Sequence, residues 1–138
     1  MYRELYEKAK AAYVNAYAPY SKLHVGAAIL CGDGTVFTGV NVENASYGAG
    51  ICAERSAAVT AVTQGHRDFR VIAICSDTGE AWPCGICRQF LYEFAPDMIL
   101  KNCHITAQQR QISNTSIRSD GANCGALRTG RISTSHSI

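Results

Sequence analysis

Three cysteines and one glutamate are the residues of this 138-residue chain whose types and spacing suit hydrolytic chemistry. Cys52 and Glu54 stand two positions apart, and Cys84 and Cys87 form the C-x-x-C spacing of the run PCGIC. Three thiolates can hold one zinc ion with its fourth position open, and a nearby carboxylate can carry the protons of a zinc-bound water. The pattern therefore predicts a hydrolytic zinc site with one ion per chain.

Each half of this pattern is weak alone, because C-x-x-C also occurs in redox motifs and in structural zinc sites. A structural zinc site is the alternative interpretation, and it would need a fourth Cys or His at a similar spacing. None lies within four residues of either segment. We therefore favour the open site.

Both segments are expected to begin helices. Residues 54–64 are rich in alanine and are followed by Gly65, and residues 84–94 carry an apolar stripe before Pro96. Two helix N-termini facing one point would expose backbone N–H groups and positive dipole ends there. This setting favours thiolate over thiol.

Three thiolates on a divalent zinc leave a net charge of minus one, which opposes ionisation of bound water. Arg55, directly after Glu54, is the first candidate to offset this charge, and Arg88, directly after Cys87, is the second. Either residue could instead be an ordinary surface arginine.

Five motifs carry a resemblance to a known family. They are YAPYSK (17–22), HVGAA (24–28), NVENASYG (41–48), CAERSA (52–57) and PCGICRQ (83–89). Together they resemble the short-chain, homotetrameric cytidine deaminases over residues 1 to about 100. The resemblance implies that Cys52, Cys84 and Cys87 bind Zn²⁺ and that Glu54 shuttles protons while cytidine and deoxycytidine are hydrolysed to uridine, deoxyuridine and ammonia in pyrimidine salvage.

The same resemblance implies a nucleoside site. Asn41 and Glu43 match residues that bind ribose hydroxyls, with Val42 between them, and side chains at i and i+2 of an extended segment project to one side. Peptide groups around Ala53 resemble those that read the pyrimidine edge. Leu23 stands where the family commonly has an aromatic residue against the base. A site that binds hydroxyls in this way should make free base a poor substrate.

The resemblance also implies a homotetramer. Tyr47, within the loop of residues 45–50, matches the part of the family that crosses between subunits. The C-terminal segment of the family reaches a neighbouring active site as well, so a changed C-terminus would weaken or abolish activity.

Composition changes at Lys101. All twelve aromatic residues lie in residues 1–100, and the last 38 residues carry ten Ser and Thr and a formal charge of plus four. Ile105, Ile112 and Ile117 follow no strand or helix period. We therefore expect a zinc domain over 1–100 and an atypical, largely disordered tail over 101–138. The tail is either a divergent end or the product of a reading-frame change near residue 101, and we favour the second.

The remaining pattern predicts the order helix, strand, strand, helix, strand, helix, strand. The elements are expected at residues 2–16, 24–30, 36–40, 54–64, 71–75, 84–94 and 98–100, with a hairpin at Gly32-Asp33-Gly34. Alternation of the later strands and helices favours parallel pairing. The expected fold is a three-layer α/β/α structure with a mixed sheet of about five strands. His24 is expected at a strand end with a satisfied hydrogen bond, and Cys31 and Cys75 are expected in the core.

Composition excludes several other functions. No apolar run approaches the ~20 residues of a membrane span, and seven cysteines with three assigned to metal favour a reducing compartment, so we expect a cytoplasmic enzyme. The first hundred residues carry a formal charge of minus two, which argues against nucleic acid as a partner. Two alternatives remain: a deaminase of a bulkier cytosine nucleoside, and a zinc-binding protein made inactive by its altered C-terminus.

Overall fold

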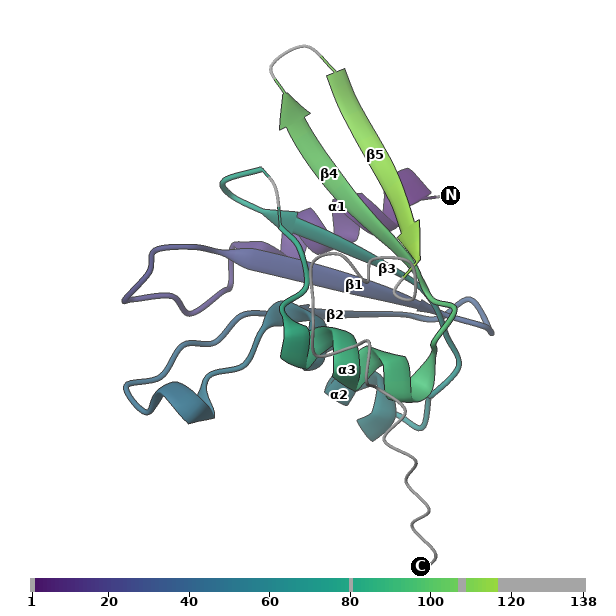
Figure 1. Ribbon diagram of the computed structural model, residues 1–138, viewed down its shortest axis with the longest axis horizontal. Helices are drawn as coiled ribbons and strands as arrows, with labels where there is room; N and C mark the ends of the chain where they lie inside the picture. Colours follow the sequence, from purple (N-terminus) through teal and green to yellow (C-terminus); the bar gives the residue numbers. More distant parts are fainter. Residues whose placement is uncertain (1, 80, 107–108, 117–138) are drawn as a thin grey trace, which may run out of the picture.

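The computed structural model describes residues 2–79, 81–106 and 109–116 (Figure 1). Three α-helices, one short 3₁₀ helix and five strands follow one another in the described residues. They are α1 (Tyr2–Tyr13), β1 (Val25–Cys31), β2 (Val36–Val40), η1 (Tyr47–Ala49), α2 (Ala53–Thr63), β3 (Phe69–Ser76), α3 (Gly85–Phe94), β4 (Ile99–Thr106) and β5 (Gln109–Ser116). The expected order of the first seven α-helices and strands is confirmed. The first helix is shorter than expected and ends at Tyr13.

The strands form one mixed sheet in the order β2-β1-β3-β4-β5. β1 pairs antiparallel with both β2 and β3, whereas β3 and β4, which flank α3 in sequence, are parallel. The expected hairpin between β1 and β2 is present, with Gly34 in the left-handed region at φ 88°. Parallel pairing across α3 places the beginning of this helix at the sheet edge where ligands of such folds generally bind.

Helices cover both faces of the sheet. α1 buries Leu5, Tyr6 and Ala9 against one face. On the other face, alanines of α2 and Leu91 of α3 pack on Ile29, Ile72 and Ile74. Figure 1 shows α2 and α3 together on one side of the sheet and α1 on the other. The expected three-layer α/β/α fold is confirmed. Cys31 and Cys75 are buried, as expected.

Two glycines let the helices approach the sheet closely. A Cβ atom added to Gly26 of β1 would lie 2.0 Å from the carbonyl oxygen of Ala9 in α1. A Cβ atom added to Gly39 of β2 would lie 2.2 Å from the backbone nitrogen of Ala57 in α2. Because both neighbours are backbone atoms, a side chain at either position would push a helix away from the sheet.

The C-terminal part differs from the sequence expectation. β4 continues through Thr106, and β5 pairs with it antiparallel from Ile99↔Ser116 to Thr106↔Gln109. The expectation of a largely disordered tail is therefore wrong for residues 101–106 and 109–116. An edge strand is held by backbone hydrogen bonds, so its polar sequence shows no apolar period. Residues 117–138 lie outside the described residues, and the division at residue 100 stays a prediction.

In the part of the chain that the structure describes, no helix has the length and apolar character that crossing a membrane requires.

Candidate metal centre and nucleoside cavity

Two helix N-termini bring the three predicted cysteines together. Cys52 is the N-cap residue of α2, Cys84 is the N-cap residue of α3, and Cys87 lies in the first turn of α3. Their three Sγ atoms lie within 4.8 Å of one another. Positive helix ends and exposed backbone N–H groups therefore face three sulfur atoms, which stabilises negative charge on them.

This set of sulfur atoms fits zinc. Tetrahedral ligands at the usual Zn–S length of about 2.3 Å stand about 3.8 Å apart. Cys52 Sγ and Cys84 Sγ are separated by 3.7 Å. The cluster found among the described residues contains these three cysteines and no fourth ligand. Three protein ligands with one open position are characteristic of catalytic rather than structural zinc sites.

Glu54 lies directly beside the sulfur atoms. Its side chain is only 4% exposed, and Glu54 Oε2 accepts a hydrogen bond from the Cys87 thiol at 3.5 Å. Burial raises the pKa of Glu54 to about 7. A carboxyl group with this pKa can both accept and donate a proton near neutral pH.

The thiols of Cys52 and Cys87 differ in pKa. The interaction of Cys52 with the neighbouring Cys87 thiol, with help from Arg55, lowers the pKa of Cys52 to about 5, and the same interaction, together with burial, raises the pKa of Cys87. Cys52 is therefore the first of the pair to become a thiolate. Arg55 Nη2 lies 3.7 Å from Cys52 Sγ, so the first candidate for charge compensation does contact the cluster.

A cavity of about 580 Å³ opens above the cysteines. Every residue predicted to bind substrate lines it, together with Glu54, Arg55, Cys52 and Cys84; these substrate residues are Leu23, Asn41, Val42, Glu43 and Ala53. Cys87 lies beneath the cavity, fully buried. The structure therefore brings the predicted metal ligands, carboxylate and substrate residues into one site.

Comparison with known proteins agrees with this geometry. Residues 1–102 match the model of the cytidine and deoxycytidylate deaminase zinc-binding region. The chain belongs to this deaminase family.

The similarity extends to individual relatives. A cytidine deaminase of Sporosarcina psychrophila is 48% identical over 92 residues, which are 66% of this chain and 68% of that protein. A probable cytidine deaminase of Dictyostelium discoideum is 52% identical over 81 residues, 57% of this chain and 55% of that protein. A Blasticidin-S deaminase of Bacillus cereus is more distant, with 35% identity over 86 residues, 56% of this chain and 61% of that protein.

Solved structures confirm the family fold. The crystal structure of cytidine deaminase from Burkholderia pseudomallei superimposes with a TM-score of 0.78 and is 44% identical. The match covers 85% of this chain and 93% of that one.

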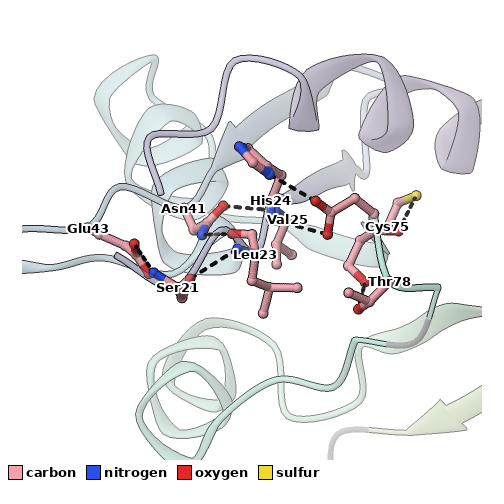
Figure 2. Close-up of polar contacts among 10 residues, drawn as sticks. Ser21, Leu23, His24, Val25, Asn41, Glu43, Cys75 and Thr78 are labelled. Carbon is pink, nitrogen blue, oxygen red and sulfur yellow. Dashed lines mark hydrogen bonds and ion pairs between the residues drawn. The ribbon is translucent and has the colours of Figure 1, made fainter. Parts of the chain in front are cut away.

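Asn41 and Glu43 hold the loop of residues 20–25 beside the deaminase cavity. Asn41 Nδ2 donates to the Leu23 carbonyl at 2.7 Å, and Asn41 Oδ1 accepts from the Val25 N–H at 2.8 Å. Glu43 Oε1 accepts from the N–H groups of Tyr20 and Ser21, each at 3.1 Å. Figure 2 shows Asn41 reaching Leu23 and Val25, and Glu43 reaching Ser21. The same two side chains thus shape the cavity wall that they line.

Leu23 follows a residue in an unusual backbone conformation. Lys22 has φ 62° and is the only described non-glycine residue in the left-handed region. Such a conformation persists where surrounding contacts impose it and is frequent near ligand sites. Here the Lys22 N–H donates to the Ala18 carbonyl at 3.1 Å, which closes the turn directly before Leu23.

Arg88 is not the surface arginine that was one of its two predicted interpretations. It is buried at 6% exposure on α3, so the interpretation as a surface arginine is wrong for this residue. Sequence reasoning could not distinguish the two roles, because the side of α3 on which Arg88 lies depends on how the helix packs.

Sequence reasoning missed several apolar residues of the cavity, among them Trp82 and Ile86. Trp82 and Ile86 line it next to Cys84 and are 43% and 65% exposed. Their position within two residues of a predicted ligand is the signal that could have identified them.

His24, expected to have a satisfied hydrogen bond, does contact Asp77, with 2.8 Å between Nδ1 and Oδ2.

Proposed function

We propose that this chain is a zinc-dependent hydrolase that converts cytidine and deoxycytidine to uridine and deoxyuridine with release of ammonia. The observation that carries the proposal is the buried Glu54 carboxyl, 3.5 Å from Cys87 Sγ, beside three convergent sulfur atoms that border a cavity of about 580 Å³. Family membership and the two cytidine deaminase relatives support the substrate class.

Cys52, Cys84 and Cys87 are the residues that would hold the zinc ion, whose Lewis acidity brings the pKa of a bound water to around 7. Arg55 beside Cys52 offsets the negative charge of three thiolates. The fully buried Cys87 excludes solvent from the inner side of the cluster.

Glu54 moves the protons in this proposal. It accepts a proton from the attacking water and delivers it to ring nitrogen 3, while the water oxygen bonds to the carbon that carries the amino group. Glu54 then transfers the second proton of the water to the amino nitrogen, the C–N bond breaks, and ammonia leaves. A carboxyl with a pKa of about 7 suits both roles, because neither protonation state is strongly preferred at neutral pH.

We assign nucleoside binding to the other predicted residues that line the cavity. Asn41 keeps one N–H and one lone pair for a sugar hydroxyl after bonding to Leu23 and Val25, and Glu43 keeps Oε2. Val42 lies between them, the peptide groups around Ala53 face the base edge, and Leu23 covers the base.

We also propose that the chain acts as a homotetramer in pyrimidine salvage in the cytoplasm. Tyr47 supports the assembly, because this large aromatic side chain is 93% exposed at the cavity and is suited to contact a neighbouring copy. Cys31, Cys52, Cys75, Cys84 and Cys87 are free thiols, which fits a reducing compartment. Light scattering on the parent and on Tyr47→Ser would test the assembly, with a smaller mass expected for the variant.

The experiment for the proposed activity combines turnover with metal content. Cytidine conversion is followed by ultraviolet absorbance, ammonia is measured in the same reaction, and zinc per chain is determined on the same sample. We expect one ammonia per uridine, comparable turnover of deoxycytidine, and much slower turnover of cytosine, because free base lacks the sugar contacts. Bound zinc without turnover of any nucleoside would contradict the proposal.

A second candidate is a deaminase of a bulkier cytosine nucleoside. The similarity to the Blasticidin-S deaminase favours it. Including blasticidin S in the substrate panel decides between the two. Preference for cytidine supports the first proposal, and preference for blasticidin S replaces it.

A further inference from the structure

Two walls of the cavity come from segments far apart in sequence. One wall contains Tyr20 and Leu23, and the other contains Ala81 and Trp82 in the connection between β3 and α3. A nucleoside base in the cavity would contact both. The separation of the two walls therefore controls how well the base fits.

His24 and Asp77 join these walls directly. His24 follows Leu23, and Asp77 opens the connection from β3 to α3. Asp77 Oδ2 lies 2.8 Å from His24 Nδ1, and Asp77 Oδ1 accepts from the His24 N–H at 3.3 Å. In return, the Asp77 N–H donates to the His24 carbonyl at 3.1 Å. Figure 2 shows His24 with its hydrogen bonds beside Leu23 and Asn41.

The pair lies at the end of the β1–β3 ladder. Val25 and Ser76 are the last paired residues of the two strands, so His24 and Asp77 extend the pairing by one position, through one backbone hydrogen bond and through their side chains. Both side chains are about one-third exposed, at 35% and 30%. The fold does not need this pair for its core, because both helical layers pack elsewhere.

We propose that the His24–Asp77 pair is a positioning device that fixes the Leu23 wall against the Trp82 wall and thereby sets nucleoside affinity. The inference rests on the proposed function and deepens it. Neither residue lines the cavity. Releasing the pair should weaken binding of the ground state and the transition state equally, which raises KM and leaves kcat unchanged.

The chain offers a matched control. His66 and Asp33 form a second exposed pair with the same 2.8 Å contact between a ring nitrogen and Oδ2. This pair joins the turn after α2 to the β1–β2 hairpin, and neither residue lines the cavity. Its loss tests the effect of removing an exposed His–Asp pair without moving a cavity wall.

The test compares His24→Leu, Asp77→Ala, the double variant and His66→Leu. We expect about a three- to fivefold rise in KM for cytidine in the first two, the range that an exposed pair can supply, with kcat within about twofold of the parent. The double variant should be no worse than either single variant. His24→Asn should recover most of the affinity, because its amide N–H can replace the ring N–H. His66→Leu should leave KM unchanged.

A second readout does not depend on turnover. Trp82 is the one tryptophan of the chain, so acrylamide quenching of tryptophan fluorescence reports on one cavity wall directly. Quenching should increase in His24→Leu and Asp77→Ala and stay at the parental level in His66→Leu. If the parent turns over no nucleoside, the proposed function fails and quenching still decides the positioning role.

Three results would overturn the inference. The first is a KM and a quenching that stay at the parental level in both His24→Leu and Asp77→Ala. The second is a loss of kcat at constant KM in these two variants. The third is a rise in KM in His66→Leu equal to that in His24→Leu. The last result would mean that loss of stability, rather than wall position, lowers affinity.

Discussion

The two ends of α2 have different roles: the N-terminus carries the residues proposed to act in catalysis, and the C-terminus contacts the β1–β2 hairpin. At its N-terminus, Cys52 caps the helix and Glu54 is 4% exposed beside the sulfur cluster. At its C-terminus, Gly65 turns the chain at φ 85°, and His66, whose side chain is 27% exposed, contacts the more exposed Asp33. The first end has polar groups whose charge is changed by burial and by one another, whereas the second has a partly exposed pair. The first end should therefore determine activity, and the second should affect stability only slightly.

The largest expected effect comes from removing a ligand at the first end. Cys84→Ala should lose zinc and turnover together, because two remaining sulfur atoms cannot complete a three-ligand site. Zinc content and cytidine turnover, measured on one preparation, check this. Cys31→Ala is the control, since Cys31 is buried in the core outside the cluster and should retain the metal. Full zinc occupancy in Cys84→Ala would show that the ligand set is misassigned.

Gly39 of β2 lets the first half of α2 pack closely on the sheet and so affects the position of the whole helix. Gly39→Val places side-chain atoms where the Ala57 backbone nitrogen lies, and we expect it to lower the free energy of unfolding by about 3 kcal/mol. Turnover should fall as well, since the cysteine end of the helix moves. Urea unfolding measures the first effect. Gly48→Ala, which meets no atom within 4 Å, should be nearly neutral, and equal losses in the two variants would contradict the packing argument.

Leu23 lines the cavity beside the cysteine end of α2, and an aromatic residue in its place should improve the affinity for cytidine. Leu23→Phe should lower KM for cytidine about two- to tenfold, because a stacked aromatic ring contributes roughly 0.5 to 1.5 kcal/mol beyond apolar contact. Steady-state kinetics check the change, with Val14→Phe as an exposed apolar control outside the cavity. An unchanged or higher KM in Leu23→Phe would mean that Leu23 does not face the base.

The smallest effect is expected at the second end. The Thr35 hydrogen bond, together with His66, lowers the pKa of Asp33. The stabilisation by Asp33 is therefore complete above its unfolded pKa of about 3.9 and disappears as the pH falls through the lower folded value. Asp33→Asn should lower the melting temperature by about 1–3 °C at pH 7, and parent and variant should converge in acid. A difference that grows as the pH falls would contradict this sign.

Sequence alone indicated which residues gather at the first end, because Cys52, Glu54, Cys84 and Cys87 lie in short motifs at helix starts. Local spacing places such residues relative to their own helix. Gly65 likewise gave the end of α2, since only a residue free to adopt positive φ continues the chain there.

Contacts between distant segments were not predictable in the same way. His24 and Asp77 are 53 positions apart and meet only because β1 and β3 pair with a particular register. Arg88 is buried because of how α3 packs, and β5 pairs through its backbone. None of these features produces a periodic pattern in the amino-acid sequence.

Glu54→Gln is the most direct test of the central claim that a buried carboxyl at the start of α2 carries the protons of a zinc-dependent deamination. The measurement is kcat for cytidine with zinc per chain determined on the same sample, and Glu93→Gln, an exchange at an exposed position of α3, is the control. We predict retained zinc and a loss of kcat of at least about ten-thousand-fold, since one group serves several proton transfers. Retained zinc with kcat within tenfold of the parent would contradict the account.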